Sequence, residues 1–363
     1  MTTIAVPRKR ANPGYRFLRI ALFAVIAIVV YQLVLFLALQ QQWLVGTSAL
    51  SAADAFPVAV QQTINALSIG AIYALIALGY TMVYGIIELI NFAHGDVFMV
   101  GAFLSIFVTL GIFGQQVGTS VTNIPFLILL LVAALVIVMP LTGLLNLTIE
   151  RIFYRPFRGG SRLAPLITAV GVSFILQNLA LVIVGSGDRG APQVFPLEWK
   201  IPFGGANISV LSIFIFALAV SLMVALNLFV SKTRLGRAMR ATAQDQQAAS
   251  LMGVDLNQTI ALTFLLGGAL AGAAGVVWGL RFGFVRQDLG FNAGLKSFTS
   301  AVLGGIGNIN GAALGGFFIG FTENLASACG FSRWSEFLVF LILTFVLIFR
   351  PTGILGQQLG DRA

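Results

Sequence analysis

Long apolar stretches alternate with short polar connections along almost the whole chain. The apolar stretches cover residues 20–39, 60–86, 97–113, 124–148, 163–185, 208–230, 259–280, 311–328 and 334–350. About 20 apolar residues in a helix cross a bilayer core of about 30 Å. Backbone amides in hydrocarbon must also bond within their own segment. The pattern therefore predicts an all-α, polytopic transmembrane bundle of about eight or nine helices, with one or two broken or re-entrant segments.

The composition argues against several classes of function. Only 9% of the residues are charged, against about 25% in ordinary soluble domains. A single cysteine, Cys329, and a single histidine, His94, argue against a disulfide framework and against a metal site. The chain has no G-x-x-x-x-G-K-[ST], HExxH or GxSxG motif and no clustered carboxylate pair. We therefore expect no catalytic residues, no metal and no cofactor, so that the protein is not an enzyme.

The positive charge follows the loops. Lys and Arg are concentrated in the N-terminal tail and in the connections 150–162 and 231–258, whereas the connections 40–57 and 114–123 have none. Cytoplasmic loops are the Lys/Arg-rich ones, so we expect a cytoplasmic N-terminus. Because the net charge of +9 is confined to such loops, it indicates topology and contact with membrane lipid, and we expect no nucleic acid partner.

The C-terminus is also expected to be cytoplasmic, because Arg350 follows the last apolar run. Nine full crossings would place it outside. We therefore expect residues 294–310 and the next helix to enter and leave from the outer face, which leaves eight net crossings. The first run could be a signal peptide cleaved near residues 53–55, but its length favours an uncleaved anchor. Residues 357–363 would form a cytoplasmic tail.

A first polar interruption follows the long run 59–87. As one helix this run exceeds the bilayer core, so it must tilt strongly or break. Beyond it, Asn91, His94 and Asp96 supply polar groups beside Gly95, which allows the chain to turn. One interpretation is a polar turn in which Asp96 caps the next helix. The other is a translocation path, because backbone breaks at membrane depth occur where they line a cavity.

A second interruption covers residues 304–311, where four of eight residues are glycine. Such a stretch does not hold a stable helix, so we expect a half-helix, a turn and a second helix. Transporters place broken segments of this kind at the solute path, which makes Gly307, Asn308, Asn310 and Gly311 candidates. Close helix packing through small residues is the alternative.

Other small and charged residues have structural interpretations. A set of glycines in the run 259–280 predicts close helix contacts: Gly267, Gly268, Gly272, Gly275 and Gly279. Glu323 lies in an apolar run where a charge is costly. It either pairs with Lys296 or lies near the surface, and the sequence leaves both open.

The basic connection 231–258 carries a short helical pattern. Ala238, Ala241, Ala248 and Leu251 are spaced for one helix face, and Gly253 would cap its end. Alone, this segment could lie on anionic lipid. However, residues 247–253 resemble the E-A-A-x-x-x-G coupling motif of bacterial ABC permeases, with Gln247 in place of the usual Glu. That resemblance implies a short helix that docks into a cleft on an ATPase subunit. The residues assigned to it are Gly236, Arg237, Arg240, Gln247, Ala248, Ala249 and Gly253.

A wider resemblance covers about residues 60–356. Residues 65–101, 236–253, 296–316 and 350–354 resemble, in order, branched-chain amino acid ABC permeases of the LivH type. The resemblance implies a permease domain at 58–356 in the bacterial cytoplasmic (inner) membrane. Residues 1–57, with their anchor helix, would be an addition to it. Its partners would be a second related permease subunit, two cytoplasmic ATPases and a periplasmic solute-binding protein.

Three other functions stay open from the sequence. Urea and amide ABC permeases are similar to the LivH type, so the motifs specify the family rather than the solute. A proton- or sodium-driven secondary transporter would need an ionisable group deep in the bundle, for which Glu323 or Asp96 are available. A channel would conduct without ATP or binding protein.

Overall fold

The computed structural model describes residues 28–37, 52–158 and 163–356, and within them seven helical stretches are long and apolar enough to cross a membrane. These stretches are α2 (Ala52–Ile87), α3 (His94–Ile106) with the π-helical η1 (Phe107–Ile112), α4 (Ile124–Ile149) with η2 (Glu150–Tyr154) and η3 (Arg155–Phe157), α5 (Leu163–Val184), α6 (Val210–Lys232), α9 (Leu256–Phe282), and α12 (Ser335–Phe349) with η4 (Ser332–Trp334). The predicted all-α transmembrane bundle is confirmed.

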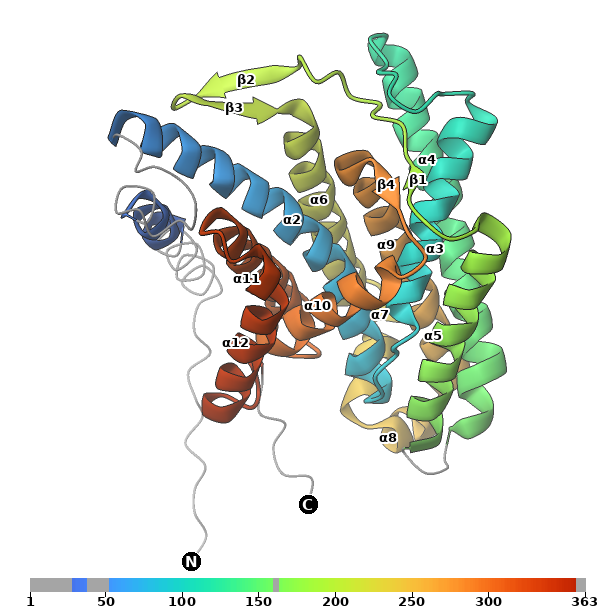
Figure 1. Cartoon of the computed structure of the whole chain (residues 1–363). Coiled ribbons are helices and arrows are strands. Elements are labelled where there is room, and N and C mark those ends of the chain that lie inside the picture. Colours follow the sequence, from blue (N-terminus) through green and yellow to red (C-terminus); the bar gives the residue numbers. More distant parts are fainter. Residues whose placement is uncertain (1–27, 38–51, 159–162, 357–363) are drawn as a thin grey trace, which may run out of the picture.

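Shorter elements complete the bundle (Figure 1). They are α7 (Arg234–Gln244), α8 (Gln246–Leu251), α10 (Leu289–Gly304), α11 (Ile309–Ala328), and a short apolar helix over Ile28–Leu37. Four strands form two small antiparallel sheets, in which β1 (Arg189–Gly190) pairs with β4 (Phe284–Val285) and β2 (Lys200–Phe203) pairs with β3 (Ala206–Ser209). The β2–β3 turn is made by Gly204 and Gly205, both with positive φ (58° and 80°), a conformation that favours glycine.

Most predicted spans agree with the described helices to within a few residues, although α2 begins earlier than expected, at Ala52. The run 59–87 tilts rather than breaks, because α2 is one continuous helix that crosses the bundle obliquely (Figure 1). The first predicted span is described only at residues 28–37. Its flanks, and the tails 1–27 and 357–363, lie outside the described residues. The domain boundaries near residues 57 and 356 stay predictions.

Helix α9 lies at the centre of the bundle, and its small residues let three neighbours approach it closely. A Cβ added at Gly267 would lie 3.3 Å from the carbonyl oxygen of Gly79 on α2. One at Gly272 would clash with Thr142 Oγ1 on α4, and one at Gly275 would lie 2.5 Å from the backbone nitrogen of Ala102 on α3. The predicted packing role of the α9 glycines is confirmed.

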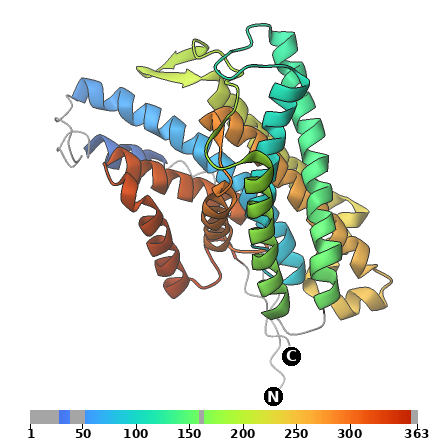
Figure 2. The same ribbon diagram turned by 45° about the vertical axis from the view of Figure 1, so that its right-hand side comes forward.

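The half-length helix α10 lies across the middle of the molecule, with α11 and α12 beside it (Figures 1 and 2). Helix α11 packs along α2 through facing small residues. A Cβ at Gly320 would clash with the backbone of Gly70, and one at Gly316 would clash with the backbone of Ala74. Both helices are therefore held at a separation that only small residues permit.

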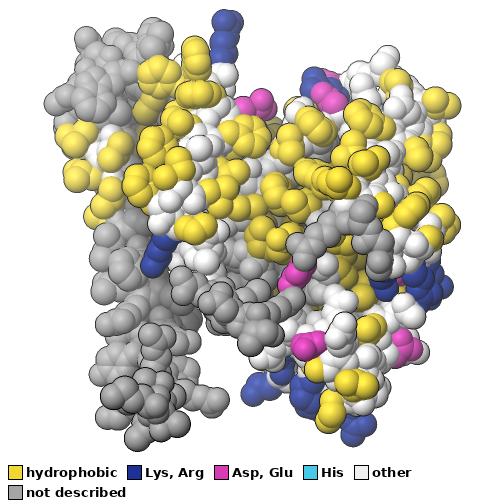
Figure 3. All heavy atoms as spheres, turned by 90° about the horizontal axis from the view of Figure 1, so that it is seen from below, with side chains coloured by type: hydrophobic (Ala, Val, Ile, Leu, Met, Phe, Trp, Pro, Cys, Tyr) yellow, Lys and Arg dark blue, Asp and Glu magenta, His cyan; other side chains and the backbone are white. Residues whose placement is uncertain are grey.

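The two ends of the bundle differ in charge. The strands β2 and β3 lie at one end, and α7 and α8 lie at the other (Figure 1). The end with α7 and α8 carries exposed Lys and Arg side chains, some of which form dark blue groups on the face in Figure 3. The exposed basic residues of the connections at this end are Arg151, Arg155, Lys232, Arg234, Arg237 and Arg240. The lower end of α12 points to the same end.

The glycine contacts predict opposite effects on stability for two Gly→Ala substitutions. Gly316→Ala should destabilise the subunit by about 1–3 kcal/mol despite the better helix propensity of alanine, because the added methyl overpacks against Ala74. Gly171→Ala on α5 should be neutral or stabilising, since nothing lies within 4 Å of a Cβ there. Thermal unfolding in detergent, followed by size exclusion, measures both. Equal midpoints for the two variants would contradict close α2–α11 packing.

Candidate functional site

The first interruption is built into the core of the subunit. Helix α2 ends where Glu88 takes a left-handed backbone conformation (φ 55°). Asn91, 1% exposed, accepts a hydrogen bond from the Tyr154 hydroxyl at 2.9 Å and donates to Asn146 Oδ1 at 3.4 Å. Asn146 in turn donates to the Phe264 carbonyl at 2.7 Å. This chain of hydrogen bonds joins the α2–α3 break to η2, α4 and α9.

Asp96 does not cap α3, so that prediction is wrong. Helix α3 begins at His94 with no side-chain cap, which places Asp96 inside the first turn. Its carboxylate instead accepts hydrogen bonds from Ser173 Oγ at 2.5 Å and Gln177 Nε2 at 3.1 Å, both on α5. The helix starts earlier than expected, and Asp96 joins α3 to α5.

His94 and Gly95 are also enclosed. The imidazole of His94 is 0% exposed and lies edge-on to the Tyr80 ring, with ring centroids 4.7 Å apart. It also lies beside the backbone of Ile76 on α2. A Cβ added at Gly95 would clash with the Gly290 carbonyl oxygen on α10. These contacts favour a structural turn for the first interruption, and its role in a path stays a prediction.

The second interruption has the expected form of half-helix, turn and helix. Helix α10 ends at Gly304 and α11 begins at Ile309. Asn308 caps α11, because its side-chain oxygen accepts from the backbone N–H of Asn310 at 3.1 Å and of Gly311 at 3.2 Å. Its amide nitrogen donates to the Leu355 carbonyl at 2.8 Å. The turn therefore contacts the segment that follows α12.

The second interruption is more accessible than the first. Gly307 and Asn310 are exposed and Asn308 is half-buried, whereas Gly304, Gly305 and Gly311 are buried. Asn310 Oδ1 accepts a hydrogen bond from Asn227 Nδ2 on α6 at 2.9 Å. A Cβ at Gly85 on α2 would lie 3.1 Å from Gly307 Cα. The structure thus brings the second interruption onto α2 and α6, while the first faces α4, α5, α9 and α10.

The predicted coupling segment forms two capped helices. Thr233 Oγ1 accepts from Gly236 N at 2.9 Å at the start of α7, and Asp245 Oδ1 accepts from Ala248 N at 2.9 Å at the start of α8. The Gly253 cap is confirmed, because its φ is 83° and the next amide bonds back to the Ala249 carbonyl at 3.0 Å.

The residues predicted to share one helix face are divided between two helices, with Ala238 and Ala241 in α7 and Ala248 and Leu251 in α8. Met239, Thr242 and Ala249 are buried, as is Gly236. The other residues assigned to coupling are exposed, namely Arg237, Arg240, Gln247, Ala248 and Gly253. Leu251 and Met252 are 87% and 86% exposed at the tip of the loop. The sequence analysis did not include Met252 among the coupling residues. The signal that could have identified it is the pair of large apolar residues directly before Gly253 in an otherwise polar loop.

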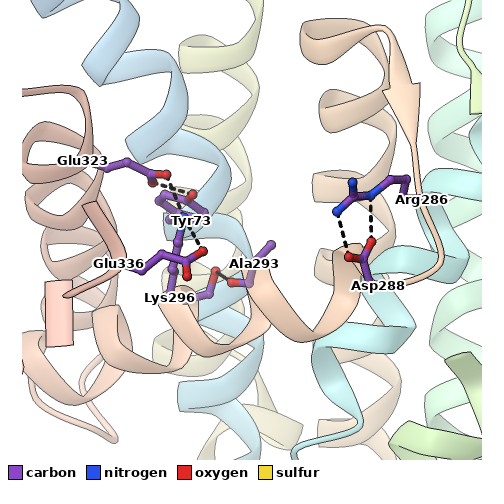
Figure 4. A network of polar contacts seen from close by, with 8 residues as sticks. Tyr73, Arg286, Asp288, Ala293, Lys296, Glu323 and Glu336 are labelled. Carbon is purple, nitrogen blue, oxygen red and sulfur yellow. Dashed lines mark hydrogen bonds and ion pairs between the residues drawn. The ribbon is translucent and has the colours of Figure 1, made fainter. Parts of the chain in front are cut away.

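A cleft of about 450 Å³ between α2, α9, α10 and α11 was not predicted at all. It is lined by Ile69, Tyr73, Trp278, Phe282, Phe284, Arg286, Asp288, Leu289, Asn292, Ala293, Lys296, Glu323, Asn324 and Ser327. Glu323 pairs with Lys296 at 2.7 Å and accepts from the Tyr73 hydroxyl at 2.6 Å, so the pairing alternative is confirmed (Figure 4). Of the described residues, no three His, Cys, Asp or Glu are grouped for a metal ion.

Known proteins resemble most of the chain. Residues 62–347 match the family described as "Branched-chain amino acid transport system / permease component". The chain belongs to this family. It is 43% identical over 301 residues to the high-affinity branched-chain amino acid transport system permease protein BraD of Pseudomonas aeruginosa, covering 82% of this chain and 96% of the relative. The permease protein LivH of Escherichia coli is 40% identical with the same coverage.

Membership of the family confirms the resemblance carried by the four sequence segments. The chain is a multi-pass membrane protein of the permease type. Its motifs lie in three places in the fold: the α2–α3 break, the α7–α8 loop, and the α10–α11 turn with the segment after α12. Helix α10 links the first and third of these, because Gly290 near its start contacts Gly95 and its end leads into the turn. The cleft is lined by the first half of this helix.

The buried amide network predicts different effects on stability for two Asn→Ala substitutions. Asn91→Ala should destabilise the subunit by about 1–3 kcal/mol, because Tyr154 and Asn146 each lose a buried partner. Asn178→Ala should have little effect, since Asn178 is exposed and its amide donates to the Phe174 carbonyl of its own helix, at 2.8 Å. Thermal unfolding of the purified subunit measures both variants. A midpoint for Asn91→Ala equal to that of the Asn178→Ala control would contradict the network.

Proposed function

We propose that this chain is a permease subunit of a binding-protein-dependent ABC importer for branched-chain amino acids. The observation that carries the proposal is the 43% identity to BraD over 82% of the chain, since BraD is a branched-chain amino acid permease protein. The accessible α10–α11 break inside an otherwise apolar bundle supports a transport role, because transporters place broken segments of this kind at the solute path.

The proposed assembly has further subunits. A second related permease would complete the path, a periplasmic solute-binding protein would deliver the solute, and two cytoplasmic ATPases would drive the cycle. The exposed Lys and Arg of the α7–α8 end support a cytoplasmic position for that end, in the bacterial cytoplasmic membrane. Both termini would then be cytoplasmic. Residues 1–57 would be an addition to the permease unit 58–356.

The α7–α8 loop is the proposed ATPase contact. Leu251 and Met252 project almost fully exposed from a loop that is capped at Thr233, Asp245 and Gly253. Two large apolar side chains at the tip of a short helix suit a helix-in-groove contact. Burying each of them in a partner contributes about 1.5–3 kcal/mol.

A charge at this tip should uncouple the transporter. Leu251→Asp and Met252→Asp should each lower uptake and ATPase stimulation by roughly tenfold or more, because the groove would have to bury a carboxylate. Membrane insertion should be unchanged, since both side chains are exposed in the subunit. Gln244→Asp, which adds the same charge at an exposed polar position of α7, is the control. Wild-type coupling in both tip variants would remove the assignment.

The solute path is proposed to pass both interruptions. Each interruption places small and polar groups where the chain would otherwise be continuous apolar helix, and the second has exposed members. The candidate residues are Asn91, His94, Gly95, Asp96, Gly307, Asn308, Asn310 and Gly311.

Thiol labelling tests this path in a Cys329→Ser background. Cysteines at positions 308 and 310 should react with small aqueous thiol reagents. Cysteines at 91 and 94 should react only in nucleotide states that open the subunit, because both positions are buried here. The rates are measured with and without ATP. If all four thiols stay inert in every state, the path lies elsewhere.

A further inference from the structure

A pair of opposite charges lies inside the cleft between α2, α9, α10 and α11. The side chains of Lys296 and Glu323 are only 12% and 19% exposed, and their charged atoms are 2.7 Å apart. Tyr73 donates its hydroxyl to the second Glu323 oxygen at 2.6 Å. Keeping two charges largely out of water is costly, and ionisable groups enclosed in a membrane bundle are a functional-site hypothesis by default. An apolar pair of the same volume would often stabilise the fold equally well.

The remaining cleft wall is apolar and aromatic. Ile69, Trp278, Phe282 and Leu289 line it beside the charged pair. The indole Nε1 of Trp278 has no hydrogen-bond partner within the described residues. The volume of about 450 Å³ falls in the range of about 300–1,000 Å³ typical of small-molecule sites. The cleft therefore combines both signs of charge with an apolar surface.

We propose that this cleft binds the solute as a zwitterionic α-amino acid. Lys296 would hold the α-carboxylate, Glu323 would hold the α-ammonium group, and the apolar side chain would lie against Trp278 and Phe282. The inference rests on the proposed function and adds to it the place where the permease binds the solute and the groups that hold its two charges. It assigns the permease itself, rather than a binding protein alone, a part in selecting that class.

Charge balance explains why a zwitterion fits. An α-amino acid carries one charge of each sign close together, so it replaces each partner of the Lys296–Glu323 pair without changing the net charge of the cleft. When the solute leaves, the pair re-forms and competes with rebinding, which keeps the site weak enough for release. A neutral solute such as urea offers no charge to either group and would leave the pair intact.

A second ion pair lies at the rim of the same cleft. Arg286 makes two hydrogen bonds to Asp288, at 2.9 and 2.7 Å, and both side chains are nearly half exposed. Figure 4 shows this pair and the Lys296–Glu323 pair on either side of Ala293. The charged residues that line the cleft therefore sum to zero, so the wall favours neither an anion nor a cation over a zwitterion.

The test uses the complete transporter in proteoliposomes, with Asn292→Cys in a Cys329→Ser background. Asn292 is exposed and lines the cleft. Leucine should slow labelling of this thiol by a small aqueous reagent several-fold. Leucinamide, which lacks the carboxylate, and urea should not slow it. Adding Glu323→Gln should abolish the protection.

Uptake measurements separate this inference from the proposed function. Lys296→Gln and Glu323→Gln should each lower leucine uptake roughly tenfold or more. The control Glu198→Gln removes the same charge and should change uptake little, because Glu198 is exposed and is not part of the cleft wall. Wild-type leucine uptake with no protection of the thiol overturns the inference and leaves the proposed function standing. Absence of any amino acid uptake by the wild type overturns both. Labelling keeps the test decisive if a charge variant fails to fold.

Discussion

Close backbone contact at small residues is the constraint on which the rest of this structure depends. Lipid gives helices no hydrophobic reason to associate, so they must gain by packing atoms against one another. Here α9 meets three helices through glycines, and α11 meets α2 through Gly70, Gly316 and Gly320. These contacts hold the bundle tightly enough to enclose the half-length helix α10 and the irregular backbone on either side of it.

Enclosure in turn determines how the polar groups are used. Asn91, Asp96 and Glu323 each find partners on other helices, so the polar groups join helices as well as interrupting them. Such links are favourable in a low-dielectric interior because an unpaired group there is costly. The same bundle leaves one charged pair at the wall of a cleft, where its charges remain available to a solute.

The helices could be predicted from sequence because bilayer thickness sets their length, and the second interruption because glycine-rich sequence does not continue a helix. The roles of individual polar residues could not. The partner of Asp96 is Ser173, 77 positions away on α5. The cleft draws residues from four helices and the β4 connection, and no local pattern unites them. The sequence shows two adjacent apolar residues at Leu251 and Met252, but their exposure could not be predicted, because it depends on which other elements the loop contacts.

We propose that this subunit belongs to a transporter that uses ATP to carry branched-chain amino acids across the membrane. The most direct measurement is accumulation of labelled leucine in proteoliposomes that hold the complete transporter, with ATP on the α7–α8 side and binding protein on the other. We expect accumulation that requires both ATP and binding protein and that urea does not inhibit. Flux without ATP, or ATP-dependent uptake of urea in place of leucine, would contradict it.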